Sequence, residues 1–293
     1  MATIHLLLPL ASSILTVVGL LFLKQAQARS TSTWTTLLAV AWVTGLCFLS
    51  LTALGGTMQP WMQLWQPASV GALFLIGLTF TFLGVRIGDV SIVTPVQGVK
   101  VLLVPAFAIL ITRDVAGQQV WLAAAVAVGG IWLIGANDDS VDRSRIRISI
   151  ACALLAAVSL TFFDLLIQRW APAWGPGYFL PIAFGSTAVL SLFLLPLASQ
   201  PEHPIRSQLN MPLLLGSLLM AVQAFGMTFT IAKFGDATRV NIVYSLRGLW
   251  GVLLTWMLSK SLGLTADSPS TPLMLKRLAG AVLIGVSIVL ALS

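Results

Sequence analysis

The sequence predicts an all-α integral membrane protein with ten transmembrane helices that form two inverted five-helix repeats. Three observations lead to this expectation. The 293 residues are 58% hydrophobic and 9% charged, and the mean hydropathy is +0.97, whereas a soluble domain has about 25% charged residues. The apolar residues are gathered in runs of about 20, the length of a helix that crosses a bilayer. Finally, one polar stretch within this apolar chain occurs twice.

Glycines, prolines and polar residues divide the apolar sequence into ten candidate spans. The first run has no Lys or Arg before it and is long enough to cross a membrane, so we interpret it as a transmembrane helix and not as a signal peptide. The connections are short, so no soluble domain is expected between spans. The expected spans cover about 4–23, 34–54, 68–86, 89–112, 117–136, 148–169, 177–198, 211–233, 236–259 and 273–292.

The repeated stretch defines the internal symmetry. Its two copies bridge spans three to four and spans eight to nine, so the repeat unit is five spans. Because five is odd, the second copy enters the membrane from the opposite face, as in many secondary transporters. The two copies, 86–102 and 233–249, align without a gap: Gly88-Asp89 with Gly235-Asp236, and Lys100 with Arg247.

We therefore expect one membrane domain. The first repeat covers 1–136, the linker 137–147 and the second repeat 148–293. Most Lys and Arg residues follow odd-numbered spans, so the positive-inside rule places that side in the cytoplasm and both termini outside. The expected location is a cell membrane, either the bacterial inner membrane or an equivalent one.

Lys100 and Arg247 are expected deep inside this membrane. Each lies eleven residues after its Asp, roughly 16 Å along a helix and near the middle of a core about 30 Å thick. A charge at that depth is costly and marks a functional site by default. We predict an anion-binding site, in which Arg247 contacts a carboxylate or phosphate bidentately and Lys100 acts as a point charge. The alternative is that both cations pair internally with acidic groups or carbonyls.

Further polar residues precede each cation at steps of three. We predict that they bind substrate beside the cations, and polar contacts between helices explain each of them equally well. Thr94 and Gln97 precede Lys100, and Asn241 and Tyr244 precede Arg247.

Three acidic residues are candidates for gating or coupling. Asp89 and Asp236 directly precede apolar helices, where a carboxylate satisfies free backbone N–H groups and complements the positive helix end. Capping is therefore their first interpretation, and a gate the second. Asp164 lies inside span six. We predict it either as a protonatable coupling group or as an interfacial partner of Arg169 or of the linker.

Several classes of function find no support in the sequence. It contains no HExxH motif, no Asp-rich metal motif, no Ser/His/Asp set and no phosphate-binding glycine loop. We therefore expect neither an enzyme nor a bound cofactor or metal. The basic residues form no patch with aromatic side chains, so nucleic acid is not an expected partner. The expected partners are the lipid bilayer and a small-molecule substrate.

These features resemble the drug/metabolite transporter superfamily, and within it the ten-helix EamA-like transporters. The resemblance covers essentially the whole chain and is most specific at 88–105 and 235–250. It implies two inverted five-helix repeats, with helices four and nine among those that line a central cavity. Span one carries Ser12, Ser13 and Thr16, where small multidrug transporters have a membrane-embedded Glu. Cation–proton exchange of that kind is therefore not expected. The better-known ten-helix relatives have both termini in the cytoplasm, opposite to the charge count, which leaves the orientation open.

The leading functional prediction is a secondary transporter or exchanger of a small anionic metabolite. Alternating access would rock the two repeats around a midplane site that contains Lys100 and Arg247. The alternative prediction is a membrane interaction or assembly protein, in which both cations are structural charges. A cavity at the two cations favours the first prediction, and dry packing of both cations on acidic groups or carbonyls favours the second.

Overall fold

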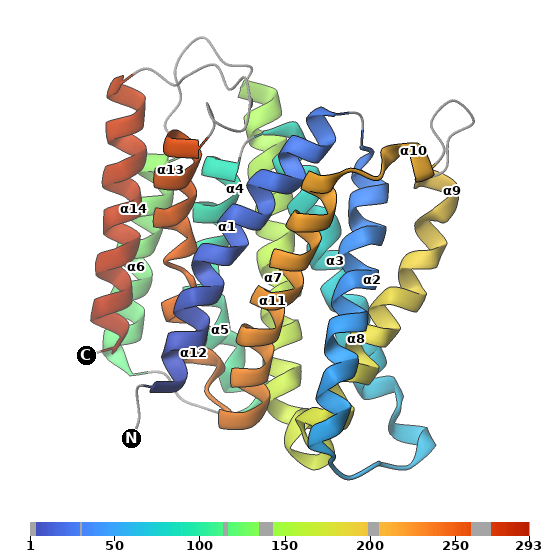
Figure 1. Cartoon of the computed structure of the whole chain (residues 1–293). Coiled ribbons are helices and arrows are strands. Elements are labelled where there is room, and N and C mark those ends of the chain that lie inside the picture. Colours follow the sequence, from blue (N-terminus) through green and yellow to red (C-terminus); the bar gives the residue numbers. More distant parts are fainter. Residues whose placement is uncertain are drawn as a thin grey trace.

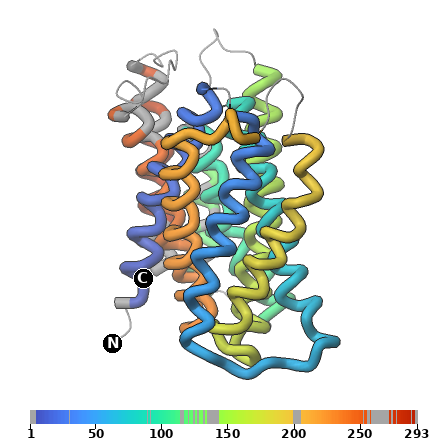
Figure 2. The backbone as a smooth tube through the Cα atoms, turned by 45° about the vertical axis from the view of Figure 1, so that its right-hand side comes forward, coloured from blue at the N-terminus to red at the C-terminus, as the bar shows by residue number. Residues whose placement is uncertain are grey.

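Helices make up every regular element of the structure. The computed structural model describes residues 4–29, 31–88, 90–113, 117–134, 143–198, 205–258 and 271–292. All elements within these ranges are helical, which confirms the predicted all-α class. The long helices lie side by side along one direction, and α1 begins at the same end of the bundle at which α14 ends (Figure 1, Figure 2).

The helices follow one another closely along the chain. The first half contains α1 (Leu7–Ala28), α2 (Thr33–Leu49), α3 (Trp65–Ile87), α4 (Val90–Val96), α5 (Lys100–Ile111) and α6 (Gln118–Ile134). The second half contains α7 (Arg143–Trp174), α8 (Pro176–Ser191), α9 (Leu195–Ala198), α10 (Ile205–Gln208), α11 (Met211–Phe234), α12 (Ala237–Tyr244), α13 (Arg247–Leu258) and α14 (Thr271–Leu292). Short 3₁₀ turns add η1 (Ile4–Leu6), η2 (Ser50–Leu54), η3 (Trp61–Gln63), η4 (Gln97–Val99) and η5 (Leu192–Leu194).

Seven helical segments of the described residues are long and apolar enough to cross a membrane. They correspond to seven of the ten predicted spans and indicate a multi-pass membrane protein. In the other three the described apolar helix is shorter. Helix α6 has 17 residues, α12 and α13 have 8 and 12, and the apolar stretch of α14 is Leu278–Ser287. The seven segments are Leu7–Ala28, Thr33–Leu54, Trp61–Ile87, Ile92–Ile111, Arg143–Trp174, Pro176–Ala198 and Met211–Phe234.

Polar side chains fix the beginning of several helices. Ser32 Oγ accepts a hydrogen bond from the Thr35 N–H at the start of α2, and Asn210 Oδ1 accepts one from the Leu213 N–H at the start of α11. Such caps satisfy backbone donors that have no partner inside the helix. Helix α11 ends at Gly235, whose φ of 68° is left-handed, a conformation that glycine adopts without steric cost.

Small residues bring the long helices into close contact. Helix α1 packs along α11, α3 along α7, and α6 along α14. At Gly77 in α3 an added Cβ would lie 2.6 Å from Leu160 of α7, and at Gly216 in α11 it would lie 2.7 Å from Leu23 of α1. Glycine at these positions therefore allows the backbone approach that is typical of helix pairs in membranes.

Two of the predicted spans are broken in the middle. The fourth is interrupted by η4, next to Pro95 and Gly98, which the sequence made easy to kink. The ninth was expected as one continuous helix over 236–259, but it stops at Ser245. The hydroxyl of Ser245 bonds back to the Ile242 carbonyl, at 2.7 Å. Such a local bond competes with the helical hydrogen-bond ladder, although the same bond at Ser13 lies within the unbroken α1 and therefore does not by itself explain the break.

The four half-helices form two pairs. Helix α4 packs against α13, and α5 packs against α12. The first pair lies toward one end of the bundle and the second toward the other (Figure 1). The contact between α4 and α13 is close, because an added Cβ at Gly248 would lie 3.1 Å from the Pro95 Cα. The breaks therefore meet inside the bundle, where the candidate site lies.

Candidate functional site

Lys100 and Arg247 occupy equivalent places at the two breaks. Lys100 is the first residue of α5 and Arg247 is the first residue of α13. Both residues are buried, with exposed fractions of 4% and 3%. The two side chains line the same cavity, as expected from their equivalent positions in the repeated stretch.

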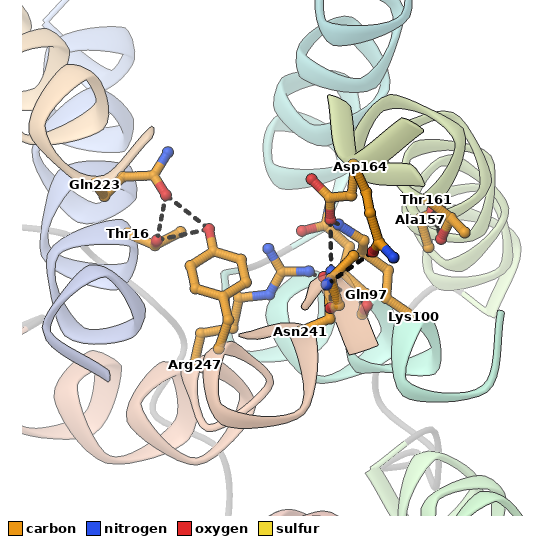
Figure 3. A network of polar contacts seen from close by, with 12 residues as sticks. Thr16, Gln97, Lys100, Ala157, Thr161, Asp164, Gln223, Asn241 and Arg247 are labelled. Atoms are coloured by element: carbon orange, nitrogen blue, oxygen red, sulfur yellow. Dashed lines mark hydrogen bonds and ion pairs between the residues drawn. The ribbon is translucent and has the colours of Figure 1, made fainter. Parts of the chain in front are cut away.

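Asp164 of α7 is the ion-pair partner of Lys100. The Lys100 Nζ lies 2.6 Å from the Asp164 Oδ2, and both side chains are buried. The same oxygen accepts a hydrogen bond from the Asn241 Nδ2 of α12, at 2.7 Å. Figure 3 shows the lysine and the amide converging on this carboxylate. Asn241 also donates to the Ala237 carbonyl, and its own Oδ1 is buried without a hydrogen-bond donor.

This pairing corrects one of the two predictions for Asp164. The residue is 1% exposed, so it lies inside the bundle. Its partner is Lys100 and not Arg169, whose Nη1 donates to the Ile111 carbonyl. The prediction of a coupling group remains a prediction. The other predicted partner of Asp164 was the linker 137–147, of which 137–142 lie outside the described residues.

Arg247 has a much poorer set of partners. Its Nη2 donates to the backbone oxygen of Gln97 at 3.2 Å, and its guanidinium carbon lies 4.5 Å from the centre of the Tyr244 ring. Among the described residues, its Nε is buried without a hydrogen-bond partner. A guanidinium carries five N–H donors. Within the described part of the chain, a neutral carbonyl and an aromatic face are thus all that compensates this charge.

Three polar side chains from separate helices meet at Tyr244. The Tyr244 hydroxyl donates to the Gln223 Oε1 of α11 at 2.8 Å and lies 2.8 Å from the Thr16 Oγ1 of α1. Figure 3 shows Thr16 and Gln223 close together, on the side of Arg247 that faces away from Asp164. Thr16 and Gln223 were not predicted as site residues. The only hint in the sequence was that both are polar residues within apolar helices. This hint identifies a site residue only when it is known which way the side chain points.

The remaining predicted residues are divided between the site and the scaffold. Gln97 lines the cavity, and its Nε2 donates to the Thr81 Oγ1 of α3 at 2.6 Å. Thr94 is buried elsewhere. Its hydroxyl donates to the Val90 carbonyl, and it packs against Gly251 of α13. Thr94 therefore belongs to the contact between the two broken helices and not to the cavity wall.

The two predicted gate residues have different outcomes. Asp236 caps α12, because its Oδ1 accepts a hydrogen bond from the Arg239 N–H at 3.1 Å. It also lies 3.7 Å from the Arg239 guanidinium and 4.0 Å from the His5 imidazole. The predicted capping role is thus present, far along the helix from Arg247. Asp89 lies outside the described residues.

The cavity is lined by both charged and apolar side chains. It offers about 50 Å³ to the centres of water-sized molecules, which is room for roughly four of them. The charged side chains of its lining are Lys100, Asp164 and Arg247, and Thr16, Gln223 and Tyr244 add polar groups. The apolar part of the lining comes partly from the same helices and is formed by Leu20, Phe74, Leu78, Leu160, Phe163, Met220, Ala224 and Met227.

The charges that line this cavity do not balance. Among the described lining residues there are two cations, Lys100 and Arg247, and one carboxylate, Asp164. A buried charge is costly unless it is paired and hydrogen-bonded. The arrangement therefore leaves one positive charge that an anion entering the cavity could neutralise. Within the described ranges, no three His, Cys, Asp or Glu side chains gather as metal ligands.

Comparison with known proteins adds information on the fold alone. The sequence matches no family model and no curated protein. The chain is similar to a solved structure described simply as a crystal structure of a protein. The two share 20% sequence identity and a TM-score of 0.64 over 98% of this chain and 95% of the other. The likeness thus extends over nearly the whole chain and concerns the fold.

Proposed function

We propose that the chain is a secondary transporter or exchanger of a small anionic metabolite in a cell membrane, such as the bacterial inner membrane. In this proposal the substrate binds in the central cavity beside Lys100 and Arg247. Two inverted five-helix repeats then rock around it to expose the cavity to one side of the membrane and then to the other. We also propose that the protein is an EamA-like member of the drug/metabolite transporter superfamily, as the resemblance implies, and that it is not an enzyme.

One observation carries the proposal. Two buried cations and one carboxylate line a cavity within the apolar bundle. Ionisable residues inside a membrane domain usually mark a substrate or ion pathway. If the charges served only to hold helices together, a balanced pair would be enough. The unmatched cation beside an open space favours a bound anion.

The packing of the helices supports the inverted repeats. When the two repeats are aligned by the two sequence copies, α1 corresponds to α7 and α3 corresponds to α11. The contact between α1 and α11 is therefore equivalent to the contact between α7 and α3, and both contacts are extensive. The contacts of α2 with α8 and of α6 with α14 are mapped onto themselves. With α6, the α12–α13 pair and α14 counted as spans, the described bundle has ten, and α1 begins on the side at which α14 ends, as in Figure 1.

The cavity wall supports the same relation. Thr81 and Thr228 both line the cavity, and the sequence offset between them equals the offset between Lys100 and Arg247. Discontinuous helices that meet at the repeat interface are the usual place of the substrate in secondary transporters. Helices α4–α5 and α12–α13 have this form.

The second candidate function is a membrane interaction or assembly protein without transport. The observation that favours it is the short ion pair between Lys100 and Asp164, together with the bond from Arg247 to the Gln97 carbonyl. These contacts are the internal pairing expected of structural charges. The cavity and the poor compensation of Arg247 argue for transport over this alternative.

The test is exchange of labelled metabolites across proteoliposomes that contain the purified protein. The panel holds carboxylates, amino acids and phosphate esters. We expect one anionic class to exchange, and Lys100→Ala and Arg247→Ala to reduce its flux strongly. Arg206→Ala is the matched control, since Arg206 is exposed on α10. If no compound exchanges through folded protein, the assembly role is favoured. If both cavity variants retain full flux, the binding site is wrong.

A further inference from the structure

The charges of the two cations in the cavity are compensated unequally, and this asymmetry indicates the class of ligand. Lys100 has a carboxylate at 2.6 Å. Arg247 has a carbonyl, an aromatic face and a buried Nε without a partner. Resting on the proposed function, we propose that the substrate is a short monocarboxylate with an apolar chain, and that Arg247 receives its carboxylate.

The symmetry of the bundle shows which group is missing. Helix α5 packs on α7, and its counterpart α13 packs on α1. On α7 the residue that faces the cation is Asp164. On α1 the polar side chain that lines the cavity is Thr16, which is neutral. The first cation therefore has a protein carboxylate and the second has none, so the ligand supplies the second carboxylate. The planar guanidinium suits this role because its N–H groups match both oxygens of a carboxylate.

The net charge of the site sets the charge of the ligand. Lys100, Arg247 and Asp164 together leave one positive charge at the cavity. A monoanion neutralises it. A dicarboxylate or a phosphate dianion would leave a buried negative charge, and a zwitterionic amino acid would leave the positive charge in place. Each of these alternatives keeps an unpaired charge away from water, which is costly.

The remaining wall sets the size and character of the ligand. The cavity has room for roughly four water-sized positions, and Leu20, Leu78, Met220 and Met227 form much of the wall that carries no charge. An apolar chain gains free energy on leaving water for such a wall. Methionine side chains adapt to ligands of different shape. A short branched acid such as 3-methylbutanoate combines one carboxylate with such a chain and serves as the probe; it is larger than four water molecules, so the side chains of the wall must move to admit it.

Binding to the purified protein in detergent micelles tests the inference. Calorimetric titration with 3-methylbutanoate is compared with 3-methylbutanamide, leucine, methylsuccinate and inorganic phosphate. We expect the monocarboxylate to bind most tightly and the neutral amide to bind at least about tenfold more weakly, since a charge-assisted contact is lost. Tighter binding of leucine, methylsuccinate or phosphate would overturn the inference.

Variants that change the charge of the cavity make the test sharper. Arg247→Gln is expected to weaken binding of the monocarboxylate by about 10- to 100-fold, and the control Arg206→Gln is expected to leave it unchanged. Asp164→Asn raises the net charge by one and should shift the preference toward methylsuccinate. If Arg247→Gln does not fold, Arg247→Lys replaces it and is expected to bind more weakly than the wild type.

The inference and the proposed function fail in different ways. If the protein exchanges phosphate esters or dicarboxylates and the exchange depends on Arg247, transport stands and the monocarboxylate assignment falls. If 3-methylbutanoate binds with the expected variant pattern but crosses no membrane, the site stands and transport falls. Equal binding by wild type and Arg247→Gln overturns the assignment of the carboxylate to Arg247.

Discussion

The ion pair between Lys100 and Asp164 predicts a specific pattern of stability. Its two side chains are only 5% and 2% exposed, and the charged atoms lie 2.6 Å apart. Removing one partner leaves the other charge buried and unpaired, which costs about 3–5 kcal/mol. Lys100→Met should therefore lower the free energy of unfolding by about this amount. The double variant Lys100→Met/Asp164→Asn removes both charges and should recover most of the loss.

Denaturant unfolding in micelles, followed by tryptophan fluorescence, measures these differences. The exposed pair of Asp236 and Arg239 is the control. Its charged atoms lie 3.7 Å apart and the Arg239 side chain is 59% exposed, so Arg239→Met should cost no more than about 1 kcal/mol. If Lys100→Met costs no more than this control, or if the double variant is as unstable as the single one, the buried pair described above is wrong.

Two further perturbations probe the scaffold and the polar group beside the site. In Gly251→Ala the new Cβ would overlap the Thr94 Oγ1 and come within 3.0 Å of the Thr94 Cβ. This overpacking should cost about 1–3 kcal/mol in the same unfolding assay, whereas Gly285→Ala, with no atom within 4 Å, should be neutral or stabilising. Tyr244→Phe removes the hydroxyl that contacts Thr16 and Gln223. Anion binding by calorimetry should weaken by about tenfold, while Tyr178→Phe should leave it unchanged. If Gly251→Ala and Gly285→Ala change the stability equally, the described packing is wrong. If Tyr244→Phe and Tyr178→Phe change anion binding equally, the described hydrogen bonds do not matter for the site.

The sequence predicted the helices better than their interruptions. Length and polarity located the seven long apolar segments, because a bilayer fixes how many apolar residues a helix needs. Pro95 and Gly98 indicated the break in the fourth span. The break at Ser245 had no such signal, since serine is compatible with a helix, and its hydroxyl here bonds to the Ile242 carbonyl. The same bond occurs at Ser13 within the unbroken α1, so the serine alone does not distinguish a broken helix from a continuous one.

The sequence singled out both cations and their neighbours Gln97, Asn241 and Tyr244, but it did not indicate Thr16, Gln223 or the partner of Asp164. The repeated stretch singled out Lys100 and Arg247, because two equivalent charges in apolar helices are rare and costly. Asp164 was noticed, but its pairing with Lys100 joins helices that are distant in the sequence. Periodicity within one helix says nothing about which helix faces it. For the same reason Thr16 and Gln223 became site residues only in the folded bundle.

The central claim is that an anion crosses the membrane through the cavity at Arg247. Counterflow of a labelled anion into proteoliposomes loaded with the unlabelled compound measures this directly. We expect transient accumulation with the wild type and with Arg206→Gln, and none above empty liposomes with Arg247→Gln. Accumulation by Arg247→Gln at the wild-type rate would contradict the claim.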